Sequence, residues 1–141
     1  MLKVNKLILV LIFLISLAVP ARAFEIPFTK GIIFNSEPLT RESVGNYGRY
    51  FPRGDRIYWL FMSKRPIKAN YIKIQIVKVT DKGPWNTVSD VVYTHDYKIL
   101  KDSPYYFTDY FVLHSGGHYY MEIFDRSKLQ RPMVVADFYV K

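Results

Sequence analysis

The chain of 141 residues contains no cysteine. This absence excludes disulfide bonds, thiol catalysis, Cys-ligated zinc, iron–sulfur clusters and the cysteine-linked lipid anchor of bacterial lipoproteins. Small exported domains often rely on disulfides because their hydrophobic cores are marginal. Stability must therefore come from packing, and 12 Tyr, 10 Phe and 2 Trp provide the large side chains for it.

Motifs that mark catalytic sites are also missing. The sequence has no Gly-x-Ser-x-Gly nucleophile elbow, no phosphate-cradling glycine-rich loop and no calcium loop of alternating acids. His95 and Asp96 are neighbours, and neighbours in a strand point to opposite faces, so they would not orient each other as a triad requires. We therefore predict that the protein is not an enzyme and has neither catalytic residues nor a cofactor.

His114 and His118 are the strongest candidates for a metal site, because a tight turn through Ser115–Gly117 could bring them together. Structural zinc normally takes four protein ligands, and no third ligand accompanies the pair. We interpret both as surface histidines and predict no metal site. Arg53–Asp55 spells the integrin-binding tripeptide Arg-Gly-Asp, but it directly precedes a bulky apolar run and is interpreted as a turn.

Strong charge of one sign is missing as well. Without residues 1–23 the chain has 17 Lys and Arg against 12 Asp and Glu, a net charge of +5 instead of +8. That balance favours anionic neighbours but is too weak for a nucleic-acid-binding tail, so we expect no nucleic-acid partner. The densest cationic cluster, Lys64–Lys68, is interpreted as a solvated turn between strands.

Residues 1–23 have the three parts of a secretory signal peptide. Two lysines begin it, an uncharged apolar run follows from Leu7 to Val19, and Ala21-Arg22-Ala23 offers the small-x-small pattern that signal peptidase cleaves. The run is shorter than the roughly 20 residues of a membrane span. We expect cleavage after Ala23, a periplasmic or secreted protein, and no transmembrane segment after cleavage. The alternative is an uncleaved anchor.

Period-two alternation dominates the rest of the chain, with prolines and glycines between the apolar runs. Ile72, Ile74 and Ile76, for example, share one face of a strand, and the residues between them are polar. The pattern predicts an all-β fold, a single antiparallel β-sandwich of about seven strands in one domain, residues 24–141. The expected strands, separated by a long loop at 35–50 and by shorter turns, are Gly31–Phe34, Asp55–Met62, Tyr71–Val79, Val91–Thr94, Tyr105–Leu113, His118–Phe124 and Met133–Val140.

One segment adds detail to the sandwich prediction. Leu113–Asp125 resembles the corner of immunoglobulin-like and fibronectin-like sandwiches, in which a leucine ends one strand, a glycine turns the chain into the other sheet and a tyrosine opens the next strand. The resemblance implies that Tyr119 is the corner tyrosine and that Met121 stands where antibody domains carry a cysteine. It also implies that Met133–Val140 pairs beside this strand. Such sandwiches serve many functions, so the resemblance does not choose one.

The aromatic run Tyr105–Phe111 is the main candidate for a binding surface. In a strand, Tyr106 and Tyr110 share the face opposite Phe107, so aromatic side chains lie on both faces although only one can meet the core. Tyrosine and tryptophan are favoured where proteins contact partners. The alternative is that the tyrosine hydroxyls only cap an edge of the core. We predict a partner-binding surface that includes Tyr106, Tyr110, Trp85 and Arg65.

These observations predict an exported, non-catalytic binding or accessory module of the bacterial cell envelope. Its protein or carbohydrate partner would contact a strand edge or an aromatic surface. Two alternatives stay open. A small hydrolase of envelope polymers would need His95, His114 or His118 to meet a carboxylate. A basic module that binds an anionic glycolipid or polymer would lose affinity steeply with added salt.

Overall fold

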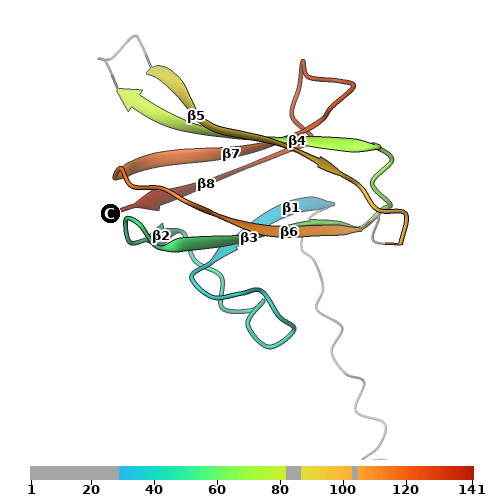
Figure 1. The fold of residues 1–141 in the computed structure, drawn as a ribbon, viewed down its shortest axis with the longest axis horizontal. Coiled ribbons are helices and arrows are strands. Elements are labelled where there is room, and N and C mark those ends of the chain that lie inside the picture. The colour runs from blue at the N-terminus through green and yellow to red at the C-terminus, as the bar shows by residue number, and fades with distance from the viewer. Residues whose placement is uncertain (1–28, 82–86, 103–104) are drawn as a thin grey trace, which may run out of the picture.

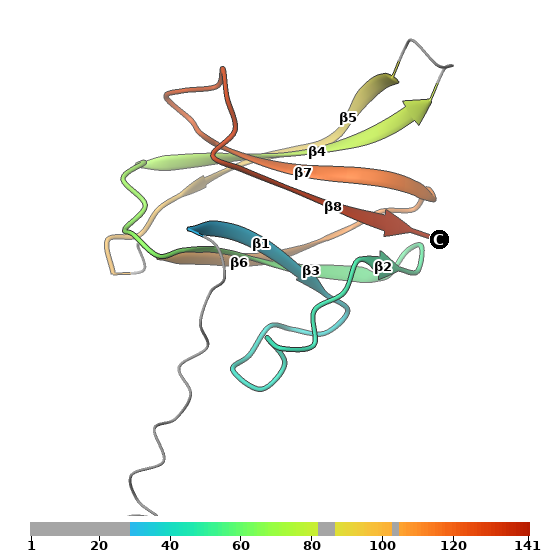
Figure 2. The same ribbon diagram turned by 180° about the vertical axis from the view of Figure 1, so that it is seen from behind.

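The structure is a computed structural model that describes residues 29–81, 87–102 and 105–141, with the backbone alone at 81, 87 and 88. The predicted signal peptide and Trp85 lie outside the described residues. Two β-sheets face each other, as Figures 1 and 2 show from opposite sides. The strands are β1 (Lys30–Asn35), β2 (Tyr50–Phe51), β3 (Arg56–Ser63), β4 (Tyr71–Asp81), β5 (Thr87–Lys98), β6 (Tyr106–Val112), β7 (Gly117–Asp125) and β8 (Val134–Val140).

The smaller sheet has the strand order β1-β3-β6 and the larger one the order β2-β8-β7-β4-β5. The all-β sandwich is therefore confirmed. It departs from the prediction at β2, a two-residue strand that pairs in parallel with β8, so the larger sheet is mixed. Two residues leave no alternating pattern, which is why the sequence does not reveal this strand. In the described ranges, no helix is long and apolar enough to cross a membrane.

The core lies between the sheets and is rich in aromatic rings. Phe138 of β8 is fully buried, and its ring contacts those of four other core residues, including Phe51 in an edge-on contact at 6.4 Å. The other centroid distances are 4.8 Å to Phe34, 5.4 Å to Phe111 and 5.5 Å to Tyr119. Because such rings bury large apolar areas and favour tilted or offset contacts, they stabilise the sandwich without disulfides.

The larger sheet both confirms and corrects the predicted strands. The alternation of β4 is as predicted, since Ile72, Ile74 and Ile76 are all fully buried. Its neighbour β5 is much longer than the predicted Val91–Thr94, because it pairs with β4 along its whole length. The outer part of this hairpin extends beyond the smaller sheet in Figure 1, and Val91 and Val92 are both exposed. The residues of β5 that the prediction missed include the exposed polar side chains of Ser89, Asp90, His95, Asp96 and Lys98, so no apolar alternation marks them as strand in the sequence.

The predicted corner between the sheets is present. The chain leaves β6 in the smaller sheet, turns at Gly117 with a φ of 151°, and enters β7 in the larger sheet. The Tyr119 hydroxyl donates a 2.6 Å hydrogen bond to the Ser115 carbonyl oxygen upstream, which is the bond that defines a tyrosine corner. Met121 is fully buried, and β8 pairs beside β7 as the resemblance implies.

The edge strands β5 and β6 are linked by a carboxylate. Asp109 of β6 accepts a 2.9 Å hydrogen bond from the Tyr97 hydroxyl of β5 and a 2.8 Å hydrogen bond from the backbone N–H of Tyr110. Burial, together with hydrogen bonds to Tyr93 and Asp109, raises the pKa of the Tyr97 hydroxyl, so it stays a donor. An inward-pointing charge on an edge strand discourages pairing with another chain. This argues against β6 as the strand edge that a partner would extend.

Candidate binding face on the five-stranded sheet

Three neighbouring strands, β2, β8 and β7, gather aromatic side chains on the outer face of the larger sheet. Side chains alternate along a strand, so Asp137 and Tyr139 point outward while Phe138 between them lies in the core. In the register of the sheet, Tyr139 pairs with Tyr50 on one side and with His118 on the other. We use the name tyrosine–histidine face for Tyr50, His118, Tyr120 and Tyr139 with the flanking Arg49, Asp137 and Lys141.

The rings of this face form a continuous row. Tyr50 and Tyr139 stack with centroids 5.1 Å apart and planes 19° apart, and Tyr139 and His118 stack at 4.4 Å and 7°. His118 also contacts Tyr120 at 4.8 Å. The Lys141 ammonium lies 4.5 Å from the Tyr50 ring centroid, in cation–π geometry. Because Tyr50 and Tyr120, which end the row, are 62% and 37% exposed, the row is ordered by its own contacts yet open to solvent.

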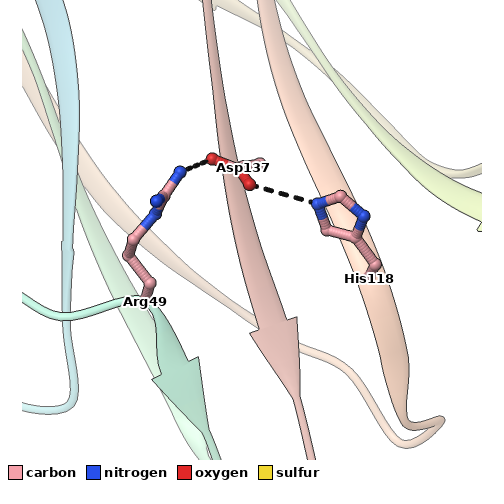
Figure 3. Close-up of polar contacts among 3 residues, drawn as sticks. All are labelled: Arg49, His118 and Asp137. Carbon is pink, nitrogen blue, oxygen red and sulfur yellow. Dashed lines mark hydrogen bonds and ion pairs between the residues drawn. The ribbon is translucent and has the colours of Figure 1, made fainter.

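Asp137 contacts two side chains beside the row, Arg49 and His118, as Figure 3 shows. One carboxylate oxygen pairs with the Arg49 guanidinium, and the other lies 3.1 Å from Nε2 of His118. The backbone holds Arg49 in place, because its carbonyl oxygen accepts a 2.6 Å hydrogen bond from the Tyr139 N–H. Ion pairs at a partly exposed site add only about 0–1 kcal/mol to stability. Their main effect here is to orient the three side chains.

The stacking decides which ligands suit the face. A sugar ring stacks on an open aromatic face, but the Tyr139 ring has Tyr50 on one side and His118 on the other. The row therefore presents ring edges and polar groups to solvent. Tyrosine and arginine combine apolar area with hydrogen-bonding groups and are enriched at the energetic centres of protein interfaces. The Tyr139 ring, stacked on both sides, offers no open face on which a sugar ring could stack.

The contact between His118 and Asp137 has the length that a catalytic pair needs, but a hydrolytic site needs more than this pair. The contacts of the His118 ring are with Asp137, Tyr120 and Tyr139, and none of these supplies a serine or threonine hydroxyl. Nor does any group of three or more His, Asp or Glu side chains in those residues have an arrangement that could hold a metal ion.

His95 lies elsewhere, on the inner side of β5. Its ring is 4.4 Å from the Tyr97 ring and 6.4 Å from the Tyr93 ring, measured between centroids. Asp96 points the other way and accepts a 2.9 Å hydrogen bond from Arg126. The prediction that His95 and Asp96 lie on opposite faces of a strand is therefore confirmed.

Two other motifs lie at turns. His114 is exposed and precedes the corner, so the corner separates it from His118, which enters the larger sheet. Arg53–Asp55 forms the turn between β2 and β3, as predicted. Gly54 has a φ of 78° there, a conformation that favours glycine.

Three of the four residues predicted as a partner-binding surface can be placed. Tyr106 and Tyr110 point outward from the smaller sheet and are 53% and 42% exposed. The Arg56 guanidinium lies over the Tyr110 ring at 4.7 Å, whereas Tyr106 lines a shallow groove beside the segment between β1 and β2. Arg65 lines a different groove at one end of the sandwich, and Trp85 lies outside the described residues.

The tyrosine–histidine face itself is missing from the sequence-based prediction. Part of the face can be recognised in the sequence. In His118–Tyr120 and in Asp137–Tyr139 the middle residue is an aromatic residue of the core, and the residues on either side of it face outward. The final strand is also predicted to pair beside β7. Tyr50, however, belongs to the two-residue strand β2, and its neighbour in space is far away in the sequence.

No protein-family model and no curated protein matches the sequence. Among solved structures, the fold is similar to the soluble domain of PmoD from a Methylocystis species, with a TM-score of 0.49 and 14% identity over 83% of this chain and 95% of that one. It is also similar to part of a beta-glucosidase from Listeria innocua, solved with glucose, with a TM-score of 0.37 and 12% identity. That match covers 79% of this chain but only 16% of the glucosidase. At these values neither likeness carries an argument about function.

Proposed function

We propose that this chain is an exported, non-catalytic, immunoglobulin-like module of the bacterial cell envelope that binds a protein partner through the tyrosine–histidine face. The observation that carries the proposal is the solvent-open row Tyr50, Tyr139, His118 and Tyr120, which the Arg49–Asp137 pair flanks. The N-terminal pattern supports export, with cleavage after Ala23 into the periplasm or beyond.

The chemistry of the row supports a protein partner. Its rings stack on one another before any partner arrives, so binding would cost little side-chain entropy. The tyrosine side chains offer apolar area and hydroxyl groups together, and Arg49 and Lys141 add cationic donors at the margin. Tyr and Arg are among the residues that most often dominate the binding energy of protein interfaces.

The hydrolase alternative rests on His118 and Asp137 alone. In a triad the second imidazole nitrogen must meet a nucleophile, whereas the neighbours of the His118 ring are Asp137, Tyr120 and Tyr139. Asp137 is also shared with Arg49, which draws the carboxylate into an ion pair. A non-catalytic role therefore accounts for the cluster with fewer assumptions.

Site-specific photo-crosslinking in the native host tests the proposal. A photoreactive phenylalanine analogue placed at Tyr50 or Tyr120 is expected to give a discrete adduct with one envelope protein. The same analogue at Glu37, an exposed residue of the loop between β1 and β2 that is not part of the face, is the matched control and is expected to give none. Placed at Tyr106, it tests the surface on the smaller sheet. An adduct from Tyr106 with none from Tyr50 or Tyr120 would contradict the proposed face.

A further inference from the structure

Positive charge is concentrated at one end of the sandwich. The loops that join β3 to β4, β5 to β6 and β7 to β8 gather there with the start of β1, at the left of Figure 2. This end has nine cationic side chains and three carboxylates. One of the carboxylates, Asp96, is the hydrogen-bond partner of Arg126. We use the name basic end for the cationic residues Lys30, Lys64, Arg65, Lys68, Lys98, Lys101, Arg126, Lys128 and Arg131.

The basic end accounts for the whole net charge of the described domain. Its nine cations and three acids, the latter being Asp96, Asp102 and Asp125, give an excess of +6. The other described residues have seven Lys and Arg against eight Asp and Glu, an excess of −1. A modest net charge is thus separated into one strongly positive pole and a nearly neutral remainder. Such a pole attracts anionic surfaces over roughly one Debye length, about 8–10 Å.

A groove of about 450 Å³ lies in this pole. Its one acidic lining residue is Asp125, and hydrogen bonds from the Ser127 hydroxyl and N–H lower the pKa of that carboxyl. Within the described residues, none of the lining cations lies within 4.0 Å of a carboxylate oxygen. Lys30, Arg65, Lys68 and Arg131 are therefore available to an external anion, whereas the charge of Lys128 also acts on the nearby Asp125 carboxylate and helps to lower its pKa.

Two exposed leucines accompany these cations. Leu100 and Leu129 are 57% and 43% exposed, and they are the only exposed leucines among the described residues. Leu100 lies between Lys98 and Lys101 in the β5–β6 loop, and Leu129 follows Lys128 in the β7–β8 loop. Apolar side chains surrounded by cations are the pattern of surfaces that insert into the interface of an anionic membrane. Binding to a soluble polyanion would not require exposed leucines, because such a molecule offers no apolar phase for them to enter.

The N-terminal segment joins the domain at the same place. Thr29, the first described residue, lines the groove, and its carbonyl oxygen accepts a 2.9 Å hydrogen bond from the N–H of Lys64. The proposed signal peptide, residues 1–23, ends six positions before Thr29. In the proposed export, the basic end is therefore the part of the domain that adjoins the membrane-inserted segment along the chain.

We propose that the basic end docks on the surface of an anionic phospholipid bilayer, with its cations against headgroup phosphates and with Leu100 and Leu129 inserted among the lipids. The tyrosine–histidine face lies toward the opposite end of β7 and β8, where Gly117 pairs with Val140, so a docked domain leaves it uncovered. This inference does not depend on the proposed protein partner.

Vesicle flotation with the protein purified after export tests the inference. We expect binding to vesicles of phosphatidylglycerol and phosphatidylcholine, no binding to pure phosphatidylcholine, and release by added salt. The variant Lys128→Glu/Arg131→Glu should bind on the order of 100-fold more weakly. Its matched control Arg41→Glu/Arg53→Glu changes the same charge away from the basic end and should bind nearly as the parent protein does. Equal losses in the two variants would overturn the inference.

A second variant separates a membrane from a soluble polyanion. Leu100→Ser/Leu129→Ser keeps every charge, so it should bind vesicles at least about fivefold more weakly while binding inorganic polyphosphate as the parent protein does. Unchanged vesicle binding by this variant would mean that the basic end recognises phosphate alone, and the membrane inference would fail. Thermal unfolding of each variant verifies that the fold is retained.

Discussion

His118 of β7 and Tyr139 of β8 stack nearly in parallel, with ring centroids 4.4 Å apart and planes 7° apart. On the inner side of the same two strands, Tyr119 and Phe138 stack at 5.5 Å and 13°. Each strand therefore contributes one ring to a surface stack and the next ring to a core stack. Since the core stack fixes the backbone under the surface stack, the outer rings are held in place before a partner binds.

The two stacks should differ sharply in their effect on stability. Replacing the buried Phe138 with Ala removes contacts to several core rings and should lower the free energy of unfolding by about 3–5 kcal/mol. Replacing its outward neighbour Tyr139 with Ala should cost about 1 kcal/mol, the value of an aromatic pair near the surface. Urea unfolding measures both. Similar losses in the two variants would contradict the assignment of inner and outer faces.

The corner bond should have a measurable energy. Tyr119→Phe keeps the buried ring but removes the hydroxyl that donates to the Ser115 carbonyl oxygen at 2.6 Å. We expect the free energy of unfolding to fall by about 1 kcal/mol. Tyr120→Phe, one position along the strand on the exposed face, is the control and should change it by less than about 0.5 kcal/mol. The same urea titration compares them, and no loss in Tyr119→Phe would show that the bond is dispensable.

A side chain at Gly117 should destabilise the fold. Its φ of 151° is unfavourable for other residues, and an added Cβ would lie 2.8 Å from Cε of Lys78. Gly117→Ala should therefore lower the free energy of unfolding by at least about 1 kcal/mol. Gly45→Ala is the matched control, because an added Cβ there meets no atom within 4 Å.

A further variant separates strain from crowding at this turn. Truncating Lys78 to Ala in the Gly117→Ala background removes the close atom but leaves the backbone conformation unchanged. Only part of the lost stability should return, and a double-mutant cycle measures that part. Full recovery would mean that the φ of Gly117 contributes nothing to the loss.

The partly buried Tyr97 hydroxyl should make the fold sensitive to alkali. Burial and the hydrogen bonds with Tyr93 and Asp109 raise its pKa above the ordinary value of 10 in the unfolded chain. The folded state therefore holds this proton more tightly, so its contribution to stability is complete below about pH 10 and declines as the pH rises further. Urea midpoints between about pH 8 and 11 should fall less steeply in Tyr97→Phe than in the parent protein. Equal slopes would contradict the shift.

The parts of the fold that the sequence predicts are those with local signals. Alternating isoleucines identify β4, and the spacing of Leu113, Gly117 and Tyr119 identifies the corner, because each pattern lies within a few consecutive residues. The full length of β5 was not predicted because the residues on either side of Val91–Thr94 are mostly polar and exposed. Strand β2 was not predicted because two residues are too few to show a periodicity.

The candidate surfaces depend on pairings that the sequence does not display. Tyr50 meets Tyr139 only through the parallel pairing of β2 and β8. The basic end likewise combines cations from several separate segments, of which Lys64–Lys68 alone stands out as a cluster in the sequence. Interpreting that cluster as a turn between strands is correct, but the charge that surrounds it emerges only when three loops come together.

The most direct measurement of the central claim compares two double variants for binding to the partner that crosslinks to the tyrosine–histidine face. Tyr50→Ala/Tyr120→Ala removes the two ends of the aromatic row, and Tyr106→Ala/Tyr110→Ala removes two exposed tyrosines from the smaller sheet. Calorimetric titration should give a Kd that is about tenfold or more higher for the first variant and nearly unchanged for the second. An unchanged Kd for Tyr50→Ala/Tyr120→Ala, or a greater loss in Tyr106→Ala/Tyr110→Ala, would contradict the account.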